Sequence, residues 1–262
     1  MTNRDILAAA LSQSAIDSAC RAEDFLADIP RFFVSRADAR ARQYLKLPHL
    51  CDFVSYGRNA VVSGRADVVE AVKPLVAATS AADLFVPPSV DELNRVLLPF
   101  GLGIRFVGSY FLPDADEFQS VSEAYSREYQ IRLLEPADFQ SLYQTRWGNA
   151  LCEKRKSLDR LCVGAYLGET LAGLAGASAD CDAMWQIGVD VLPAHRGRGI
   201  ATLITRRLAE EVFARGYIPF YCCLWSNLPS MKNAIRSGFR PAWAQMSAEP
   251  IENRNPRNGG VL

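Results

Sequence analysis

The stretch VDVLPAHRGRGIATLI, residues 189–204, constrains the fold more than any other part of the chain. An apolar run ends at Pro193, glycines stand at positions 197 and 199, and an amphipathic pattern begins at Ile200. This order predicts a strand, a tight turn and a helix. Because the first N–H groups of a helix lack partners and glycine lets a ligand approach the backbone, we expect an anion-binding site at the turn.

Other interpretations of this stretch are less well supported. A dinucleotide-binding fingerprint needs a third glycine where the chain has Thr202, and the chain contains no G-x-x-x-x-G-K-[ST] loop. A nucleic-acid patch would need clustered basic residues, but Lys plus Arg and Asp plus Glu both number 29. On this segment alone, an ordinary strand-to-helix turn with incidental arginines stays open.

Composition sets the broad class. The chain has 262 residues, of which 49% are hydrophobic, and this favours a globular protein of two domains. The seven cysteines form no CxxC pair, and His49 and His195 are the only histidines, so we expect no metal site and no disulfides. No signal peptide or apolar run of membrane-spanning length is recognisable, so we expect a cytoplasmic protein with neither membrane nor nucleic acid as a partner.

The first half of the sequence alternates between helical and strand patterns. We expect a helix over residues 4–28 and strands at 82–87 and 104–112. The acidic, polar stretch 113–128 predicts a domain boundary. Residues 1–125 are therefore expected to form a smaller α/β domain whose role no motif reveals.

The second half has a clearer order of elements. Its patterns predict strands near 129–135, 162–180, 182–193, 218–225 and 239–248, and helices at 199–216 and 226–238. The expected fold class is α/β (α+β), with a mixed, mostly antiparallel sheet flanked by helices. We assign residues 126–250 to this domain and expect residues 251–262 to be a flexible tail.

Three motifs in this half resemble one known family. The segment R-G-R-G-I-A at 196–201 matches the [QR]-x-x-G-x-[GA] motif of the GNAT superfamily of acyl-CoA-dependent N-acyltransferases. The preceding V-D-V-L-P resembles the family's splayed strand. The pattern N-x-x-S-x-x-x-A-x-x-x-G-F, from Asn227 to Phe239, resembles its later helix on the cofactor side. The resemblance covers about residues 128–247 and implies the GNAT fold.

The resemblance implies that acetyl-CoA is the co-substrate and that no metal takes part. In the family, backbone amides of the glycine motif bind the pyrophosphate, and the splayed strand pairs with the pantetheine arm. The matching positions in this chain are Val189, Val191, Arg196, Gly197, Arg198, Gly199, Ile200, Ala201, Thr202, Asn227 and Ser230. Asn227 is also a good helix N-cap, and both roles can hold together.

The implied reaction is direct attack by a primary amine of a small molecule or peptide on the acetyl thioester. This step needs a proton acceptor for the amine and a proton donor for the departing thiolate. The tyrosine that many relatives use as the donor is replaced by Ala234, so Asp182, Asp190 and Tyr221 are the catalytic candidates. The alternative is an acyl-CoA-binding sensor or regulatory protein. A homodimer is compatible with the sequence, and the acceptor amine is not identifiable from it.

Overall fold

The computed structural model of the chain describes residues 1–119 and 128–251. The predicted domain boundary at 125/126 and nearly all of the predicted tail lie outside these residues. Within the described ranges, ten strands form one sheet: β1 (Arg31–Val34), β2 (Cys51–Ser55), β3 (Val61–Gly64), β4 (Leu102–Pro113), β5 (Gln130–Leu134), β6 (Asp159–Leu167), β7 (Thr170–Ser178), β8 (Met184–Val191), β9 (Ile218–Leu224) and β10 (Phe239–Pro250). The helices are α1 (Asn3–Ser18), α2 (Ala66–Ala78), α3 (Ala81–Leu84), α4 (Pro87–Leu97), α5 (Ala115–Gln119), α6 (Ile200–Ala214) and α7 (Leu228–Arg236), together with short 3₁₀ turns.

The sheet is mixed and mostly antiparallel, which confirms the predicted fold class. Its strand order is β1-β3-β2-β10-β4-β9-β8-β7-β6-β5. The pairs β1–β3 and β8–β9 are parallel, whereas the other neighbours run antiparallel.

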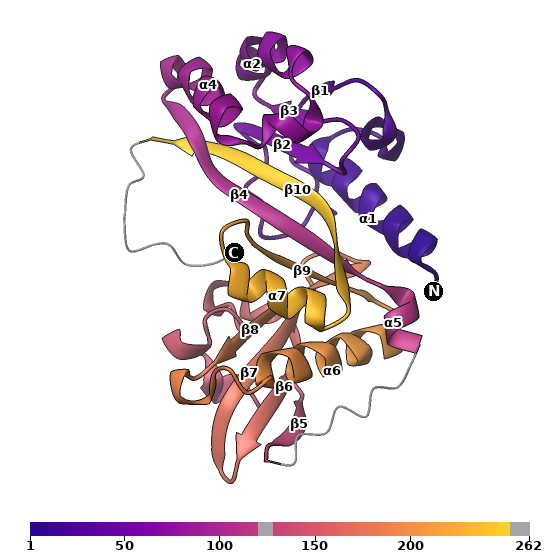
Figure 1. Ribbon diagram of the computed structural model, residues 1–262, viewed down its shortest axis with the longest axis vertical. Coiled ribbons are helices and arrows are strands. Elements are labelled where there is room, and N and C mark those ends of the chain that lie inside the picture. Colours follow the sequence, from indigo (N-terminus) through magenta and orange to yellow (C-terminus); the bar gives the residue numbers. More distant parts are fainter. Residues whose placement is uncertain (120–127, 252–262) are drawn as a thin grey trace.

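Strand β4 joins the two halves of the sequence. It comes from the N-terminal half but lies between β9 and β10, which belong to the C-terminal half (Figure 1). Tyr110 on β4 pairs with Trp243 on β10 and with Cys222 on β9, and the Tyr110 and Trp243 rings stack with their centroids 4.6 Å apart. The sheet therefore runs without a break through both halves.

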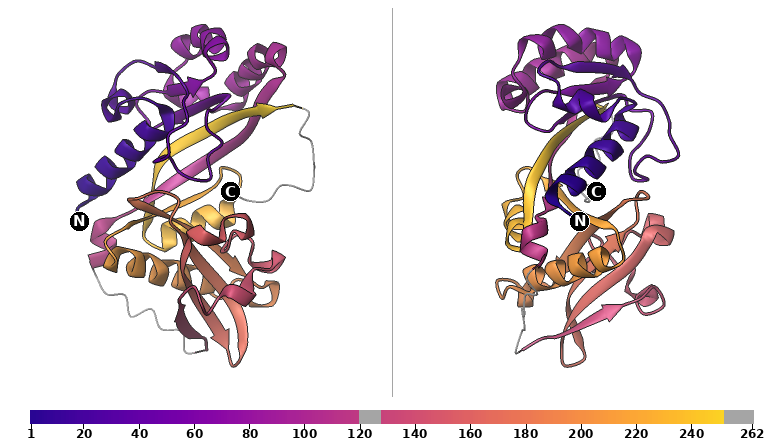
Figure 2. Two further views of the ribbon diagram at one scale, coloured as in Figure 1. Left: turned by 180° about the vertical axis from the view of Figure 1, so that it is seen from behind. Right: turned by 90° about the vertical axis from the view of Figure 1, so that its right-hand side faces the viewer.

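Alternate residues of the strands pack against different helices, as the period of two along a strand requires. On one face, Ile187 and Tyr221 pack in a core with α6 and α7. On the other face, Phe220 and Trp243 pack in a core with α1. The right-hand view of Figure 2 shows α1 and α7 on opposite sides of β10.

Two expected elements differ from the structure. The helix predicted over 4–28 ends at Ser18, because Ala19 adopts a left-handed conformation (φ 56°) and the Cys20 N–H bonds the Ala15 carbonyl. The strand predicted at 82–87 is wrong. Ser80 caps α3 by accepting a hydrogen bond from the Asp83 N–H, and α4 then begins at a proline, which is a favoured first position of a helix.

Candidate functional site

Strands β8 and β9 separate partway along their length. They pair from Met184–Ile218 as far as Ile187–Tyr221. Beyond that point β8 continues beside β7, and β9 continues beside β4. Residues 188–191 of β8 therefore have an edge toward β9 that no strand occupies. We call this divergence, between residues 188–191 and residues 222–224, the splay.

The glycine turn follows the splayed part of β8 directly. Gly197 and Gly199 both have φ of 77°, in the left-handed region that favours glycine, and Gly199 is the N-cap of α6. A Cβ built at either glycine meets no atom within 4 Å, so the turn is open. No side chain caps α6, and the first N–H groups of a helix have no acceptor within it.

The side chains around the turn brace it. The Arg196 Nε donates to the Val191 carbonyl at 3.0 Å. Arg198 forms an ion pair of 2.8 Å with Glu128 and donates to the Tyr129 hydroxyl at 3.3 Å. The same hydroxyl lies 2.8 Å from the His195 Nδ1. Both arginine side chains therefore brace the turn, and the turn is exposed from Arg196 to Gly199.

Helix α7 lies beside α6 at this end of the sheet. The Thr202 hydroxyl donates to Asn233 Oδ1 at 3.1 Å and so links the two helices. Asn227 caps α7 by accepting a hydrogen bond from the Ser230 N–H. The Ser230 hydroxyl lies 2.8 Å from the Tyr221 hydroxyl, at the last paired position before the splay. Ala234, which replaces the family's tyrosine, is fully buried in the core under the helix.

The two carboxylates predicted as candidate bases occupy different places. Asp182 is exposed in the bend before β8 and lies six residues before Gly188, a separation of about 20 Å along an extended chain. Asp190 is in the splayed part of β8, and its carboxylate accepts hydrogen bonds from Asn149 and Ala150. The structure therefore brings Asp190, and not Asp182, to the splay.

The face opposite α6 and α7 carries further polar groups that the sequence did not single out. The Gln186 Nε2 donates to Cys222 Sγ at 3.0 Å, and burial raises the pKa of the Cys222 thiol to about 12. From the N-terminal half, the buried Arg42 guanidinium lies 5.4 Å from the Phe220 ring centroid and 5.0 Å from that of Trp243. A loop that precedes β2 therefore reaches strands of the C-terminal half.

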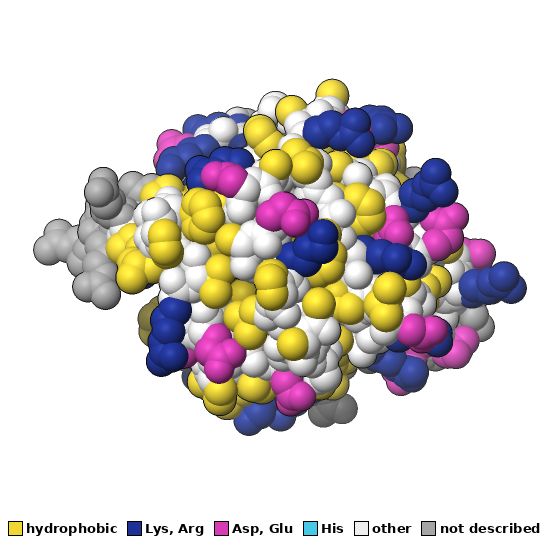
Figure 3. All heavy atoms as spheres, turned by 90° about the horizontal axis from the view of Figure 1, so that it is seen from above, with side chains coloured by type: hydrophobic (Ala, Val, Ile, Leu, Met, Phe, Trp, Pro, Cys, Tyr) yellow, Lys and Arg dark blue, Asp and Glu magenta, His cyan; other side chains and the backbone are white. Residues whose placement is uncertain are grey.

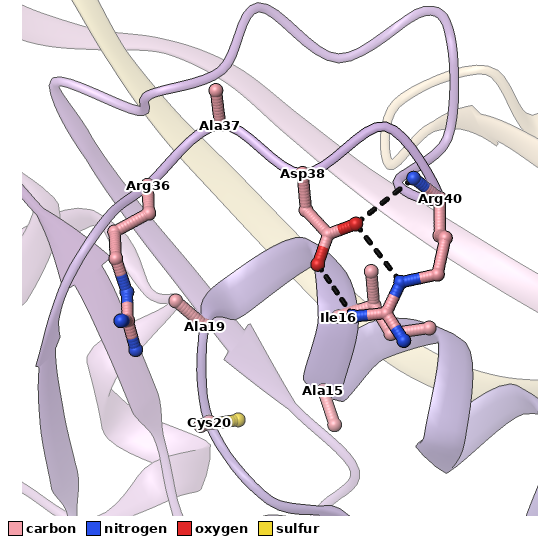
Figure 4. Close-up of a pocket in the computed structure, with 8 residues that line it drawn as sticks. All are labelled: Ala15, Ile16, Ala19, Cys20, Arg36, Ala37, Asp38 and Arg40. Atoms are coloured by element: carbon pink, nitrogen blue, oxygen red, sulfur yellow. Dashed lines mark hydrogen bonds and ion pairs between the residues drawn. The ribbon is translucent and has the colours of Figure 1, made fainter.

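A pocket of about 400 Å³ lies away from the splay, where the end of α1 meets the loop after β1. In Figure 4, Asp38 and Arg40 bond each other on one side of it, and Arg36 stands on the other. Seen from above, basic and acidic side chains are interspersed over the surface (Figure 3).

No three His, Cys, Asp or Glu side chains among the described residues come together to hold a metal ion, and none of the helices that these residues form is long and apolar enough to span a membrane.

Solved structures with similar parts include acetyltransferases. A GNAT-family acetyltransferase from Novosphingobium aromaticivorans aligns at 20% identity over 56% of this chain and 66% of its own, with a TM-score of 0.43. A GCN5-related N-acetyltransferase-like protein from Streptococcus suis aligns at 18% identity over 62% and 68%, with a TM-score of 0.46. An acetyltransferase from Salmonella typhimurium, solved with acetyl-CoA, aligns at 16% identity over 49% and 97%, with a TM-score of 0.35. The alignment thus spans about two thirds of the first two chains.

No curated protein sequence matches the chain. Residues 118–239 match the family model described as the acetyltransferase (GNAT) family. That range contains the splayed part of β8, the glycine turn, α6 and α7. The C-terminal half of this chain is therefore a domain of the GNAT acetyltransferase family.

Proposed function

We propose that the chain transfers an acetyl group from acetyl-CoA to a primary amine of a small molecule or peptide. The observation that carries the proposal is the continuity of the splayed β8 with the glycine turn. Val191 ends the strand, and eight residues later the open left-handed Gly199 forms the N-cap of α6. When bound, acetyl-CoA supplies an activated acetyl thioester.

The residues of the turn fit an anion such as the pyrophosphate of acetyl-CoA. The N–H groups at the start of α6, with the adjoining amides from Gly197 onward, form a suitable set of donors. The Arg196 N–H instead donates to the Pro193 carbonyl at 3.3 Å. A side chain at Gly197 or Gly199 would occupy the open space in front of them. In this proposal, the main-chain edge at Val189 and the Val191 N–H hold the pantetheine arm, since the Val191 carbonyl already accepts from Arg196. Asn227 contacts the arm from the start of α7.

Tyr221 and Ser230 are the proposed source of the proton that the thiolate takes up. The Tyr221 hydroxyl is protonated at neutral pH, and burial raises its pKa. The tyrosinate left after donation would therefore regain a proton from solvent. The Ser230 hydroxyl, 2.8 Å away and half-buried, would pass the proton outward. In this scheme, solvent takes up the proton that the attacking amine loses.

The proposal gives residues 1–125 the task of shaping the acceptor side. Strand β4 lies beside β9 in the sheet, and the loop that carries Arg42 packs on the sheet face opposite α6 and α7, which supports this role. A cytoplasmic location and a homodimer are also part of the proposal. Cell fractionation and size-exclusion chromatography test these two points.

The second candidate function is an acyl-CoA-binding sensor. The buried Ala234 at the family's tyrosine position favours it, since the usual proton donor is missing. Calorimetric titration with acetyl-CoA, followed by thiol release over a panel of amino acids, polyamines, aminoglycosides and peptides, distinguishes the two. Saturable turnover supports the enzyme, binding without turnover supports the sensor, and absence of binding overturns both.

A further inference from the structure

The Asp190 carboxylate accepts three hydrogen bonds from one short segment. Asn149 donates its backbone N–H at 2.8 Å and its side-chain Nδ2 at 2.5 Å, and Ala150 donates its backbone N–H at 3.0 Å. Both carboxylate oxygens are used, and the partners lie about 40 positions earlier in the chain. The arrangement ties the Asn149–Ala150 segment to β8.

Two glycines allow the same segment to rest directly on the sheet. Gly176 on β7 and Gly188 on β8 are register partners. A Cβ at Gly188 would lie 1.8 Å from the Asn149 carbonyl oxygen, and a Cβ at Gly176 would lie 1.9 Å from that of Ala150. Such distances are impossible, so any side chain at either position would push the segment off the sheet.

The position of the segment is what makes it relevant to function. Val189 and Val191 pack toward α6, so Gly188 and Asp190 point to the opposite face. There the buried Trp147 and its neighbours in a separate small core hold the segment against the sheet. The segment therefore forms a wall beside the splay, on the side from which an acceptor would approach a thioester held in the splay.

We propose that Asp190 is a positioning residue that fixes the Asn149–Ala150 segment as the acceptor-side wall. It is not the base that takes a proton from the amine. This inference rests on the proposed acetyltransferase function. The carboxylate acts through the segment, which sets how the acceptor is bound and oriented. Gly176 and Gly188 let the segment pack directly against the sheet.

The test uses the full chain with Asp190→Asn and Asp190→Ala, acetyl-CoA, and the best amine of the panel. We expect the acceptor KM to rise about ten- to hundredfold through misplacement of the wall. The acetyl-CoA Kd should change little, because the Asp190 side chain bonds Asn149 and Ala150 and does not form part of the main-chain edge that holds the pantetheine arm. The pH profile of kcat should keep its shape. Asn149→Ala, which leaves both backbone hydrogen bonds intact, should have a smaller effect. Gly176→Ala should reproduce the rise in acceptor KM with Asp190 unchanged.

Two kinetic outcomes overturn the proposal. One is a loss of kcat with an altered pH profile and an unchanged acceptor KM, as removal of a base would give. The other is wild-type kinetics in both Asp190 variants. Amide hydrogen exchange of residues 147–152 gives a readout that needs no turnover, and exchange should be faster in Asp190→Asn. If the wild-type chain acetylates no amine, the proposed function fails. Separately, equal amide hydrogen exchange of residues 147–152 in the wild type and in Asp190→Asn would show that Asp190 does not hold the segment.

Discussion

Replacing Gly199 with alanine separates the conformational role of this residue from its role at a ligand site. Gly199 has φ of 77° and caps α6, and a Cβ placed there meets no atom within 4 Å. The substitution therefore creates no clash in the free protein. Its cost to folding comes from the left-handed backbone alone.

The magnitudes of the two effects differ. Holding an alanine in the left-handed region costs about 1–2 kcal/mol, which corresponds to a Tm lower by roughly 2–8 °C for a chain of this size. In the proposed site, the added methyl group would enter the open space beside the start of α6, where the pyrophosphate would lie. Loss of one hydrogen bond to a charged group is worth about 1.5–3 kcal/mol, so acetyl-CoA binding should weaken by roughly ten- to a hundredfold.

Gly168, in the turn between β6 and β7, offers a matched control. Its φ is 57°, and a Cβ there also meets nothing within 4 Å. Gly168→Ala should therefore lower Tm by a similar amount and leave acetyl-CoA binding unchanged. Differential scanning calorimetry and calorimetric titration measure both quantities. If Gly199→Ala binds acetyl-CoA as tightly as Gly168→Ala does, the glycine turn is not the pyrophosphate site.

Three further predictions concern the acid, a buried carboxyl group and the shared sheet. Tyr221→Phe should lower kcat by about a hundredfold if the Tyr221 hydroxyl supplies the proton for the departing thiolate. The affinity for acetyl-CoA should be retained, and an unchanged kcat would show that another group is the acid. Burial raises the pKa of Asp180 from 3.8 to about 6, so its protonated form stabilises the fold below about pH 4, and this stability is lost as pH rises through 6. Asp180→Asn should therefore flatten the fall in the free energy of unfolding between about pH 4 and 6, measured by urea denaturation, whereas equal slopes would contradict the assignment. A 126–262 fragment lacks β4, so it should show no cooperative melt by circular dichroism unless residues 1–125 are co-expressed with it.

The local parts of the fold could be predicted from the sequence, because their signals lie within a few residues. The alternation of apolar residues and the turn glycines located the strands and helices from β5 to α7. The end of α1 could not be predicted in this way, since Ala19 carries no preference for the left-handed conformation that stops the helix. The insertion of β4 between β9 and β10 depends on pairs such as Tyr110–Trp243, whose partners are far apart in the chain.

In the candidate site, too, features set by a few neighbouring residues could be predicted, whereas contacts between distant residues could not. The open turn at Gly197 and Gly199 can be predicted from the sequence, because a positive φ strongly favours glycine. The contact of Tyr129 with His195 joins residues 66 positions apart, so no local sequence pattern predicts it. Asp190 was predicted only as a nearby carboxylate, because its Asn149 partner lies 41 positions away.

The splay itself depends on the N-terminal half. A strand that leaves its neighbour exposes backbone N–H and C=O groups, which must find other partners. Beyond Tyr221, β9 pairs with Gly108, Ser109 and Tyr110 of β4, so it keeps a partner strand while diverging from β8. Strand β4 therefore stabilises one arm of the splay, just as β7 supports the other through Val191. Although the family motifs all lie after residue 118, the geometry on which they depend is completed by a strand that precedes them.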